Sequence, residues 1–325
     1  MIRFDEINDK TTWNELVLKN KGLFTQSWQW GEVQKKEGSE VFRFSISRDN
    51  NPLGCFALYI KKTPAGNYGY IPRGPAIGDN GLFRNDSREF TKCLKELVEN
   101  KGVVFLLWEP AVDLDYGDLK ITNSRQPRKT ILIDLSHSLD DLLHKINKTK
   151  RYGIRYAEAH GVRINVSDKR NADFETFWKL MQGTSKRKRF GTFNRPHFEN
   201  IFNEDISRLF LAEYEGNVDA AAEVIFFADT AVYLHAGTSG KNEKLTASYL
   251  LIWEILKAAK NSGLKYFDLW GIDNNRWPGV TAFKESFGGD ERIYPEARII
   301  IYKRFRYFVY RFLHLIRRFL AKLSL

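Results

Sequence analysis

Residues 209–270 read LFLAEYEGNVDAAAEVIFFADTAVYLHAGTSGKNEKLTASYLLIWEILKAAKNSGLKYFDLW. Four short runs in this stretch are apolar, rich in β-branched and aromatic residues, and bounded by turn residues, which predicts strands. The predicted strands are 209–214, 221–227, 232–235 and 266–270. Residues 247–261 carry apolar side chains at helical spacing and predict a long amphipathic helix before the last strand. Strands followed by a helix and one more strand indicate an α/β unit.

The first half of the chain has the same order of elements. A helical region at 11–38 comes first. The predicted elements after it are strands at 41–47, 53–60 and 68–71, a helix at 83–100 and a buried strand at 103–108. The second half opens with a strand at 130–135 and a basic helix at 139–160. This order, written twice, predicts an α/β (α+β) fold of two tandem units with mainly antiparallel sheets. It is the element order of the GNAT-type acyltransferase fold.

The predicted boundaries follow from composition. Residues 111–129 are polar and rich in turn residues, so they form the predicted linker. We therefore expect a first GNAT-like domain at 1–129, a second at 130–295 and a C-terminal segment at 296–325.

The C-terminal segment has the pattern of a cationic amphipathic helix. Residues 303–325 contain seven Lys and Arg and no acid. At 100° per residue, its apolar side chains fall on one narrow face and its cations on the other. These apolar residues are Phe305, Phe308, Val309, Phe312, Ile316, Phe319 and Leu323. The pattern is typical of a helix at an anionic membrane surface, and equally of a final helix that docks its apolar face on the body.

The composition is that of a globular, basic protein. The 325 residues are 43% hydrophobic and 14% aromatic, which excludes a mainly disordered chain. The net charge of +11 suits a polyanionic partner such as nucleic acid, a phosphorylated metabolite or anionic lipid. Because the N-terminus lacks a signal-peptide pattern and no apolar run reaches about 18 residues, we expect a cytoplasmic protein without a transmembrane span.

The sequence lacks the motifs of several common kinds of catalytic and binding site. Two cysteines cannot form a disulfide framework, and the six histidines show no metal-ligand spacing, so no metal is expected. A P-loop, a dinucleotide fingerprint and a nucleophile elbow are missing too. Residues 241–247, which enter the helix after the strand at 232–235, contain no glycine to cradle a pyrophosphate. Coenzyme A is therefore not the expected donor, and no bound cofactor is expected.

Five segments, in order along the chain, resemble signature sequences of the FemA/FemB/FemX peptidoglycan aminoacyltransferases. They are 27–31 (SWQWG) followed by Lys35 and Lys36, 70–75 (YIPRGP), 150–158 (KRYGIRYAE) followed by Gly161 and Val162, 267–272 (FDLWGI) and 283–289 (FKESFGG). The resemblance runs from about residue 24 to 295 and leaves the C-terminal cationic helix outside.

The resemblance implies a non-ribosomal peptidyltransferase with an aminoacyl-tRNA donor. The acceptor would be an amine on the stem peptide of a peptidoglycan precursor, in its UDP-linked or lipid-linked form, and the C-terminal helix would place the enzyme on the inner face of the plasma membrane. Both substrates carry phosphates, which agrees with the basic composition. Two alternatives stay open. One is an N-acyltransferase of the same fold with another acyl donor, and the other is a non-catalytic basic module that binds RNA or membrane.

Three residues are the expected catalytic groups. The resemblance assigns Lys284 and Phe283 to the reacting centre, where the ammonium would stabilise an oxyanion and the ring would stack on the terminal adenine or line the aminoacyl pocket. An exposed lysine beside two core phenylalanines is the other interpretation. Glu109 ends a hydrophobic strand and is expected to orient or deprotonate the attacking ammonium, or else to close a turn or pair with a lysine.

Ten further residues are expected to bind the substrates. The resemblance favours Lys36, Arg187 and Arg195 as phosphate ligands, with a solvated helix end or a basic patch that faces tRNA as the alternatives. The other candidates for the acceptor and the cleft are Tyr70, Arg73, Tyr233 and His235. The candidates for the tRNA backbone are Lys150, Arg151 and Arg155, which share one predicted helix.

Overall fold

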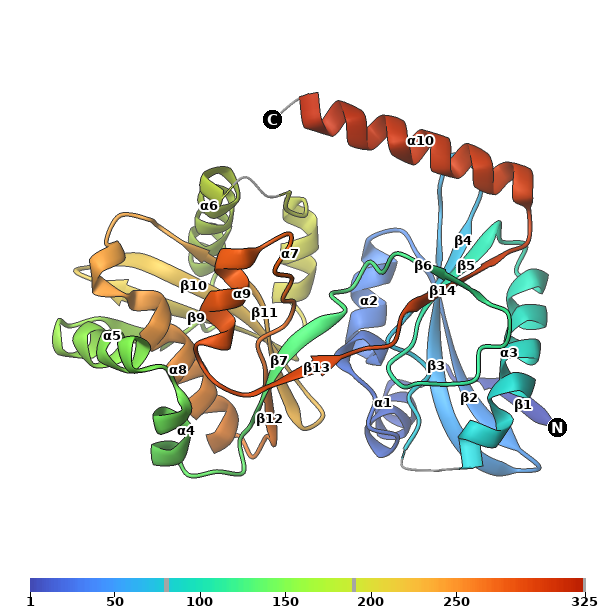
Figure 1. Ribbon diagram of the computed structural model, residues 1–325, viewed down its shortest axis with the longest axis horizontal. Coiled ribbons are helices and arrows are strands. Elements are labelled where there is room, and N and C mark those ends of the chain that lie inside the picture. Colours follow the sequence, from blue (N-terminus) through green and yellow to red (C-terminus); the bar gives the residue numbers. More distant parts are fainter. Residues whose placement is uncertain (79–81, 189–190, 324–325) are drawn as a thin grey trace. The chain divides into compact units, whose positions relative to one another are not determined.

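The computed structural model describes residues 1–78, 82–188 and 191–323, without the side chains of 82–85 and 317–323. The chain folds into two compact units (Figure 1). Unit 1 contains residues 1–126 and 294–325, and unit 2 contains residues 127–293. The last two residues of the expected C-terminal segment, 324–325, lie outside the described residues.

Unit 1 is built on a seven-stranded sheet in the order β1-β2-β3-β4-β5-β14-β6. Its strands are β1 (Ile2–Glu6), β2 (Glu40–Arg48), β3 (Asn51–Lys61), β4 (Tyr68–Pro72), β5 (Phe105–Glu109), β6 (Lys120–Thr122) and β14 (Ala297–Ile301). The helices are α1 (Lys10–Lys19), α2 (Trp28–Lys36), α3 (Leu82–Asn100) and α10 (Arg304–Leu323), with a 3-10 turn η1 (Phe24–Gln26). Only β4 and β5 pair in parallel. Phe56, Phe90 and Trp108 are fully buried in its core.

Unit 2 has a second seven-stranded sheet, in the order β13-β7-β12-β11-β10-β9-β8. Its strands are β7 (Lys129–Asp134), β8 (Arg163–Val166), β9 (Ser207–Tyr214), β10 (Asn217–Phe227), β11 (Thr230–Thr238), β12 (Tyr266–Asp268) and β13 (Asp290–Ile293). The helices are α4 (Leu139–Lys145), α5 (Lys148–Ala159), α6 (Asn171–Lys188), α7 (Arg195–Phe202), α8 (Ala247–Asn261) and α9 (Pro278–Glu285), with a 3-10 turn η2 (Glu243–Leu245). Here β11 and β12 form the single parallel pair.

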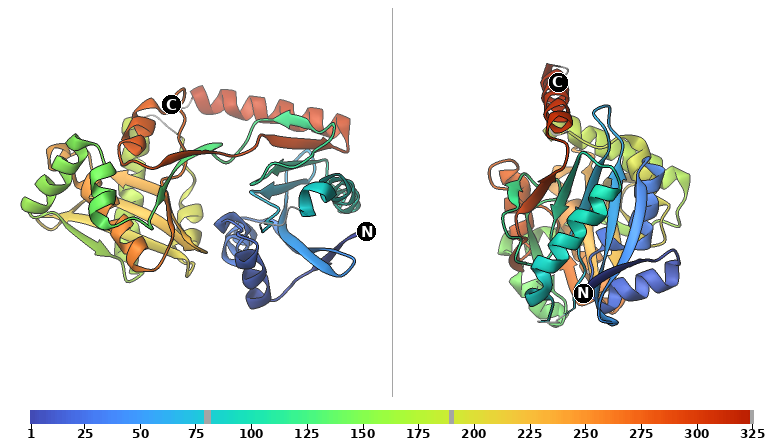
Figure 2. Two further views of the ribbon diagram at one scale, coloured as in Figure 1. Left: turned by 60° about the horizontal axis from the view of Figure 1, so that its bottom comes forward. Right: turned by 90° about the vertical axis from the view of Figure 1, so that its right-hand side faces the viewer.

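Side chains from the two faces of the unit 2 sheet fill separate clusters. Ala220 and Ala222 of β10 pack in the cluster that contains α8, whereas Ala221 between them packs with Phe177 and Phe198 of α6 and α7. This alternation is what a strand covered on both faces requires. Figure 2 shows helices on either side of this sheet. The predicted mixed α/β class with mainly antiparallel sheets is confirmed.

The sequence analysis does not predict strands β1, β6, β8 and β13 or helices α7 and α9, and three further segments differ from its prediction. Residues 297–301, expected in the C-terminal segment, form strand β14 between β5 and β6, because their isoleucines complete the sheet of unit 1. The single helix predicted at 139–160 is two helices, since Asn147 caps α5 by accepting a hydrogen bond from Thr149 N at 2.9 Å. The helical region predicted at 11–38 is broken between α1 and α2 by η1.

Helix α10 does not dock its apolar face on the body, as one of the two expectations had it. Its described phenylalanines are exposed, and Tyr307 and Tyr310 contact Phe105 of the sheet. Within the described part of the chain, no helix is both long enough and apolar enough to cross a bilayer.

Candidate active site

Lys284 lies in α9, a helix that the sequence analysis does not predict. Pro278 at the first turn fixes the start of this helix. The lysine is only 8% exposed, and its Nζ donates to the carbonyl oxygens of Gly271 at 2.9 Å and Trp270 at 3.2 Å. The interpretation as an exposed lysine is therefore wrong. An ammonium has three N–H donors, so two carbonyls leave one for a reacting group.

Burial sets the electrostatics of Lys284. Loss of hydration lowers the pKa of this lysine to about 8, and the nearby Asp268 opposes that shift. Asp268 accepts hydrogen bonds from Thr130 Oγ1 and, at 2.7 Å, from Trp270 N, while burial raises the pKa of its carboxyl. Trp270 has a left-handed backbone (φ 57°). Asp268 thus fixes the turn whose carbonyls hold Lys284.

Phe283 and Lys150 are brought together by a residue that the sequence analysis did not single out. The Tyr249 ring of α8 lies 5.8 Å from the Phe283 ring, centroid to centroid. Lys150 Nζ donates to Tyr249 Oη at 2.8 Å and lies 4.0 Å from the centre of that ring. Gly153 makes room, because a Cβ there would come within 2.5 Å of Tyr249. A glycine inside a predicted helix indicates that another side chain packs closely against the helix there, so Gly153 could have pointed to this contact.

A β-bulge separates Tyr233 from His235. In the β10–β11 register Val224 faces Tyr233 and Glu223 faces His235, so Leu234 is the extra residue. Tyr233 is therefore buried in the core beneath α8, where loss of hydration raises its pKa. It does not share a site with His235, which lies on the other face of the sheet.

His235 packs among aromatic residues of α7. Its ring centroid is 4.8 Å from that of Phe198 and 5.7 Å from that of His197. Its Nε2 is buried and has no hydrogen-bond partner among the described residues. Burial, with smaller contributions from His197 and Lys284, lowers the pKa of His235 to about 3. His235 is consequently neutral at physiological pH and cannot serve as a proton donor there.

In unit 1, Glu109 is part of a buried hydrogen-bond network. Its carboxylate accepts from Tyr70 Oη at 2.6 Å, from Gln126 N at 3.1 Å and from Arg125 N. Glu109 is 1% exposed, and burial raises its pKa while these donors oppose the shift. The geometry favours a structural role for Glu109, in which it holds residues 125–126 to the sheet, over the expected role as proton acceptor. Tyr70, at 4% exposure, belongs to the same network.

The remaining unit 1 candidates differ in exposure. Arg73 is 1% exposed, and its guanidinium carbon lies 3.6 Å from the centre of the Tyr294 ring. It is a core residue and does not line a surface. Lys36 ends α2 with an exposed side chain, as a phosphate ligand would need.

Three of the four candidate arginines in unit 2 already have partners there. Arg187 donates to Thr238 Oγ1 at 3.1 Å and to the Thr238 carbonyl, and so ties the end of α6 to β11. Arg195 forms a two-pronged ion pair with Glu175. Arg151 Nη1 donates to the carbonyls of His144 and Ile146, which satisfies the C-terminus of α4.

Arg155 differs from these three because it is exposed on α5 and forms no hydrogen bond or ion pair with the described residues. Tyr152, one helical turn away, is 68% exposed. An exposed cation beside an exposed ring on one helix is suited to contact a nucleic-acid backbone.

The family model of the FemAB family matches residues 17–124, 116–215 and 204–314. The chain belongs to the FemAB family. Lipid II:glycine glycyltransferase from Staphylococcus aureus is 25% identical over 202 residues, which cover 56% of this chain and 47% of the relative. The chain thus spans about half the length of the curated relatives that it matches.

Solved structures show the same fold. A crystal structure of FemX has a TM-score of 0.80 at 19% identity, covering 94% of this chain and 99% of the other. A tandem GNAT protein from the clavulanic acid biosynthesis pathway has a TM-score of 0.55 at 10% identity, covering 93% and 98%. This FemAB protein therefore has the tandem GNAT-like fold that the order of its elements predicted.

Several FemAB signature residues of this chain serve the fold. In SWQWG, Ser27 caps α2 by accepting from Trp30 N at 3.0 Å, and Gly31 leaves room for the buried guanidinium of Arg43. In FKESFGG, Gly288 and Gly289 both have left-handed backbones (φ 80° and 92°), which let the chain turn from α9 into β13. These four signature residues therefore have roles in capping, packing and turning the chain.

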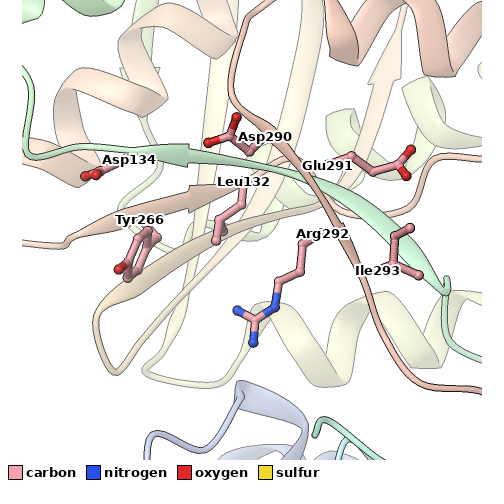
Figure 3. A pocket seen from close by; sticks show the side chains of 7 residues that line it. All are labelled: Leu132, Asp134, Tyr266, Asp290, Glu291, Arg292 and Ile293. Carbon is pink, nitrogen blue, oxygen red and sulfur yellow. The ribbon is translucent and has the colours of Figure 1, made fainter. Parts of the chain in front are cut away.

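A shallow depression of about 400 Å³ lies along β13 and contains none of the candidate residues (Figure 3). Its lining residues are Leu132, Asp134, Tyr266, Asp290, Glu291, Arg292 and Ile293. Among the described residues, no three His, Cys, Asp or Glu side chains come together as a metal site would require.

Proposed function

We propose that this FemAB protein is an aminoacyltransferase that moves an aminoacyl group from aminoacyl-tRNA to a stem-peptide amine of a peptidoglycan precursor. Family membership and the similarity to a lipid II:glycine glycyltransferase support the reaction class. The observation that carries the proposal is the buried Lys284, which two carbonyls hold in place beside Phe283.

The proposed reaction is attack of a neutral amine on the aminoacyl ester carbonyl. A C–N bond forms, the carbonyl oxygen becomes an oxyanion, and the C–O bond to the tRNA ribose then breaks. The remaining N–H donor of Lys284 would stabilise the oxyanion in a site from which water is largely excluded. The proton lost by the amine would go to the departing ribose oxygen, because Glu109 is engaged in unit 1 and His235 is a very weak base.

The turn that enters α8 supports a donor other than coenzyme A. The chain passes through η2, and Thr246 then begins α8 with a left-handed backbone (φ 53°). Glu243 places a carboxylate in that turn, which would repel a pyrophosphate. An aminoacyl-tRNA does not need this cradle. Its backbone would lie along α5, where Arg155 and Tyr152 are exposed.

The proposed acceptor is a phosphate-linked precursor, with Lys36 as its exposed ligand in unit 1. In unit 2, Arg187 and Arg195 would bind a phosphate by exchanging Thr238 and Glu175 for phosphate oxygens. A lipid-linked acceptor would keep the enzyme at the inner membrane face as a peripheral protein.

The proposal is tested by offering a full set of radiolabelled aminoacyl-tRNAs to the protein with UDP-linked and lipid-linked precursors. We expect label in at least one precursor and the identity of the amino acid from single-tRNA reactions. Label in neither precursor, with the protein folded, would contradict the proposal.

The rate of transfer should fall as the pH rises above about 8. Only the protonated ammonium of Lys284 can stabilise an oxyanion, and its lowered pKa places the loss of that proton near pH 8 instead of above 10. The measurement is kcat/KM from pH 6 to 9.5, corrected for spontaneous ester hydrolysis. A rate that keeps rising to pH 9.5 would show that the ammonium is not required.

A further inference from the structure

One face of helix α10 carries two tyrosines that attach the helix to the sheet of unit 1. The rings of Tyr307 and Tyr310 lie 5.1 Å and 4.8 Å from that of Phe105. Tyr310 Oη also accepts a hydrogen bond from Arg125 Nη2 at 2.9 Å. Lys303, just before the helix, donates from Nζ to the Gly102 carbonyl at 2.8 Å. The start of the helix is thus fixed to the body near β5 (Figure 1).

The opposite face of α10 is apolar and uncovered. Phe305, Phe308 and Phe312 are 79%, 67% and 56% exposed, and Ile316 is 40% exposed. At 100° per residue these four side chains point away from the tyrosines that touch unit 1. Three exposed phenylalanines on the same face of one helix form a contiguous apolar patch, whereas an ordinary protein surface exposes its apolar residues singly.

The charge of the segment identifies the partner. Arg304 and Arg311 are exposed and fall beside the phenylalanine face on the helical wheel. All seven ionised side chains of 303–325 are cationic. We propose that α10 binds the surface of an anionic lipid bilayer, with its phenylalanines at the acyl boundary and its cations among the headgroups.

A bilayer fits this face better than a second copy of the chain. Two α10 helices packed face to face would bring together two sets of six cations and no acid, and like charges oppose that contact. An anionic surface neutralises the same charges. This inference deepens the proposed function. Binding of α10 to the bilayer would bring the enzyme to a lipid-linked acceptor, and only that role for the binding rests on the proposed function.

The test is co-sedimentation with vesicles of phosphatidylcholine and phosphatidylglycerol, for the full chain and for the triple variant Phe305→Ser, Phe308→Ser and Phe312→Ser. We expect the variant to bind at least about 10-fold more weakly, because three apolar side chains leave the interface. The control is Ile121→Ser with Val166→Ser, which removes exposed apolar side chains from two sheets and should change nothing.

Equal vesicle binding by the triple variant would overturn the inference. So would equal binding to vesicles of phosphatidylcholine alone, or a dimer that the triple substitution abolishes without any vesicle binding. Transfer to a soluble UDP-linked acceptor separates the two proposals. We expect the triple variant to keep that activity, whereas wild-type protein that binds vesicles but transfers nothing would contradict only the proposed function.

Discussion

Lys284→Met should lower the rate of aminoacyl transfer by at least about 100-fold, the usual loss when one oxyanion donor is removed. The methionine side chain matches the lysine stem in length, so the change removes the ammonium and little else. The measurement is single-turnover transfer with saturating aminoacyl-tRNA, which separates the chemical step from binding.

The stability of the same variant distinguishes a catalytic lysine from a structural one. Burial disfavours the ammonium, whereas Asp268 and the two carbonyls that accept from it favour it, so its removal should change the Tm at pH 7 little. The matched control is Lys260→Met, because Lys260 also donates to a backbone carbonyl, that of Leu135 at 2.7 Å. Lys260→Met should keep full activity. Normal transfer by Lys284→Met, or a lower Tm that explains its loss of transfer, would contradict the assigned role.

Gly237→Ala should destabilise unit 2 by about 3 kcal/mol, as overpacking of a close backbone contact does. Gly237 lies on β11 where the backbone of α6 crosses it. A Cβ there would be 2.7 Å from Leu180 C and Met181 N, and backbone atoms cannot move aside as a side chain can. Thermal unfolding should show a Tm lower by about 5–10 °C.

The control for this substitution is Gly279→Ala in α9, where a Cβ meets nothing within 4 Å. Alanine favours helix over glycine, so this variant should be as stable as the wild type or slightly more so. If Gly237→Ala unfolds at the wild-type temperature, α6 and β11 are not packed as closely as described.

The sequence predicted strands β2–β5, β7 and β9–β12, because long apolar runs between turn residues are typical of buried strands. It did not predict the strands at the edges of the two sheets, β1, β6, β8 and β13. It missed β14, whose isoleucines follow the second unit in the chain but complete the sheet of the first. A pairing between residues about 190 positions apart leaves no local signal. It also missed helix α9, although Pro278 at its first turn is a residue favoured at the start of a helix.

The site was predicted only in part. A signature pair identified Lys284 and Phe283, but its supports, Asp268 and Tyr249, emerge only when α8, α9 and β12 are placed together. Tyr233 and His235 were both expected at the cleft, but a bulge that no local pattern revealed places them on opposite faces of the sheet. Glu109 looked like a base at a strand end, yet three donors from within unit 1 occupy it.

The identity of the acyl donor is the central claim, and one measurement tests it directly. Wild-type protein is incubated with both precursors and either aminoacyl-tRNA, the same tRNA after ribonuclease treatment, or acetyl-coenzyme A, and the mass of each precursor is then determined. We predict a gain of one or more amino acid residues with intact aminoacyl-tRNA alone. An acetyl gain from coenzyme A, or no gain from aminoacyl-tRNA, would contradict the account.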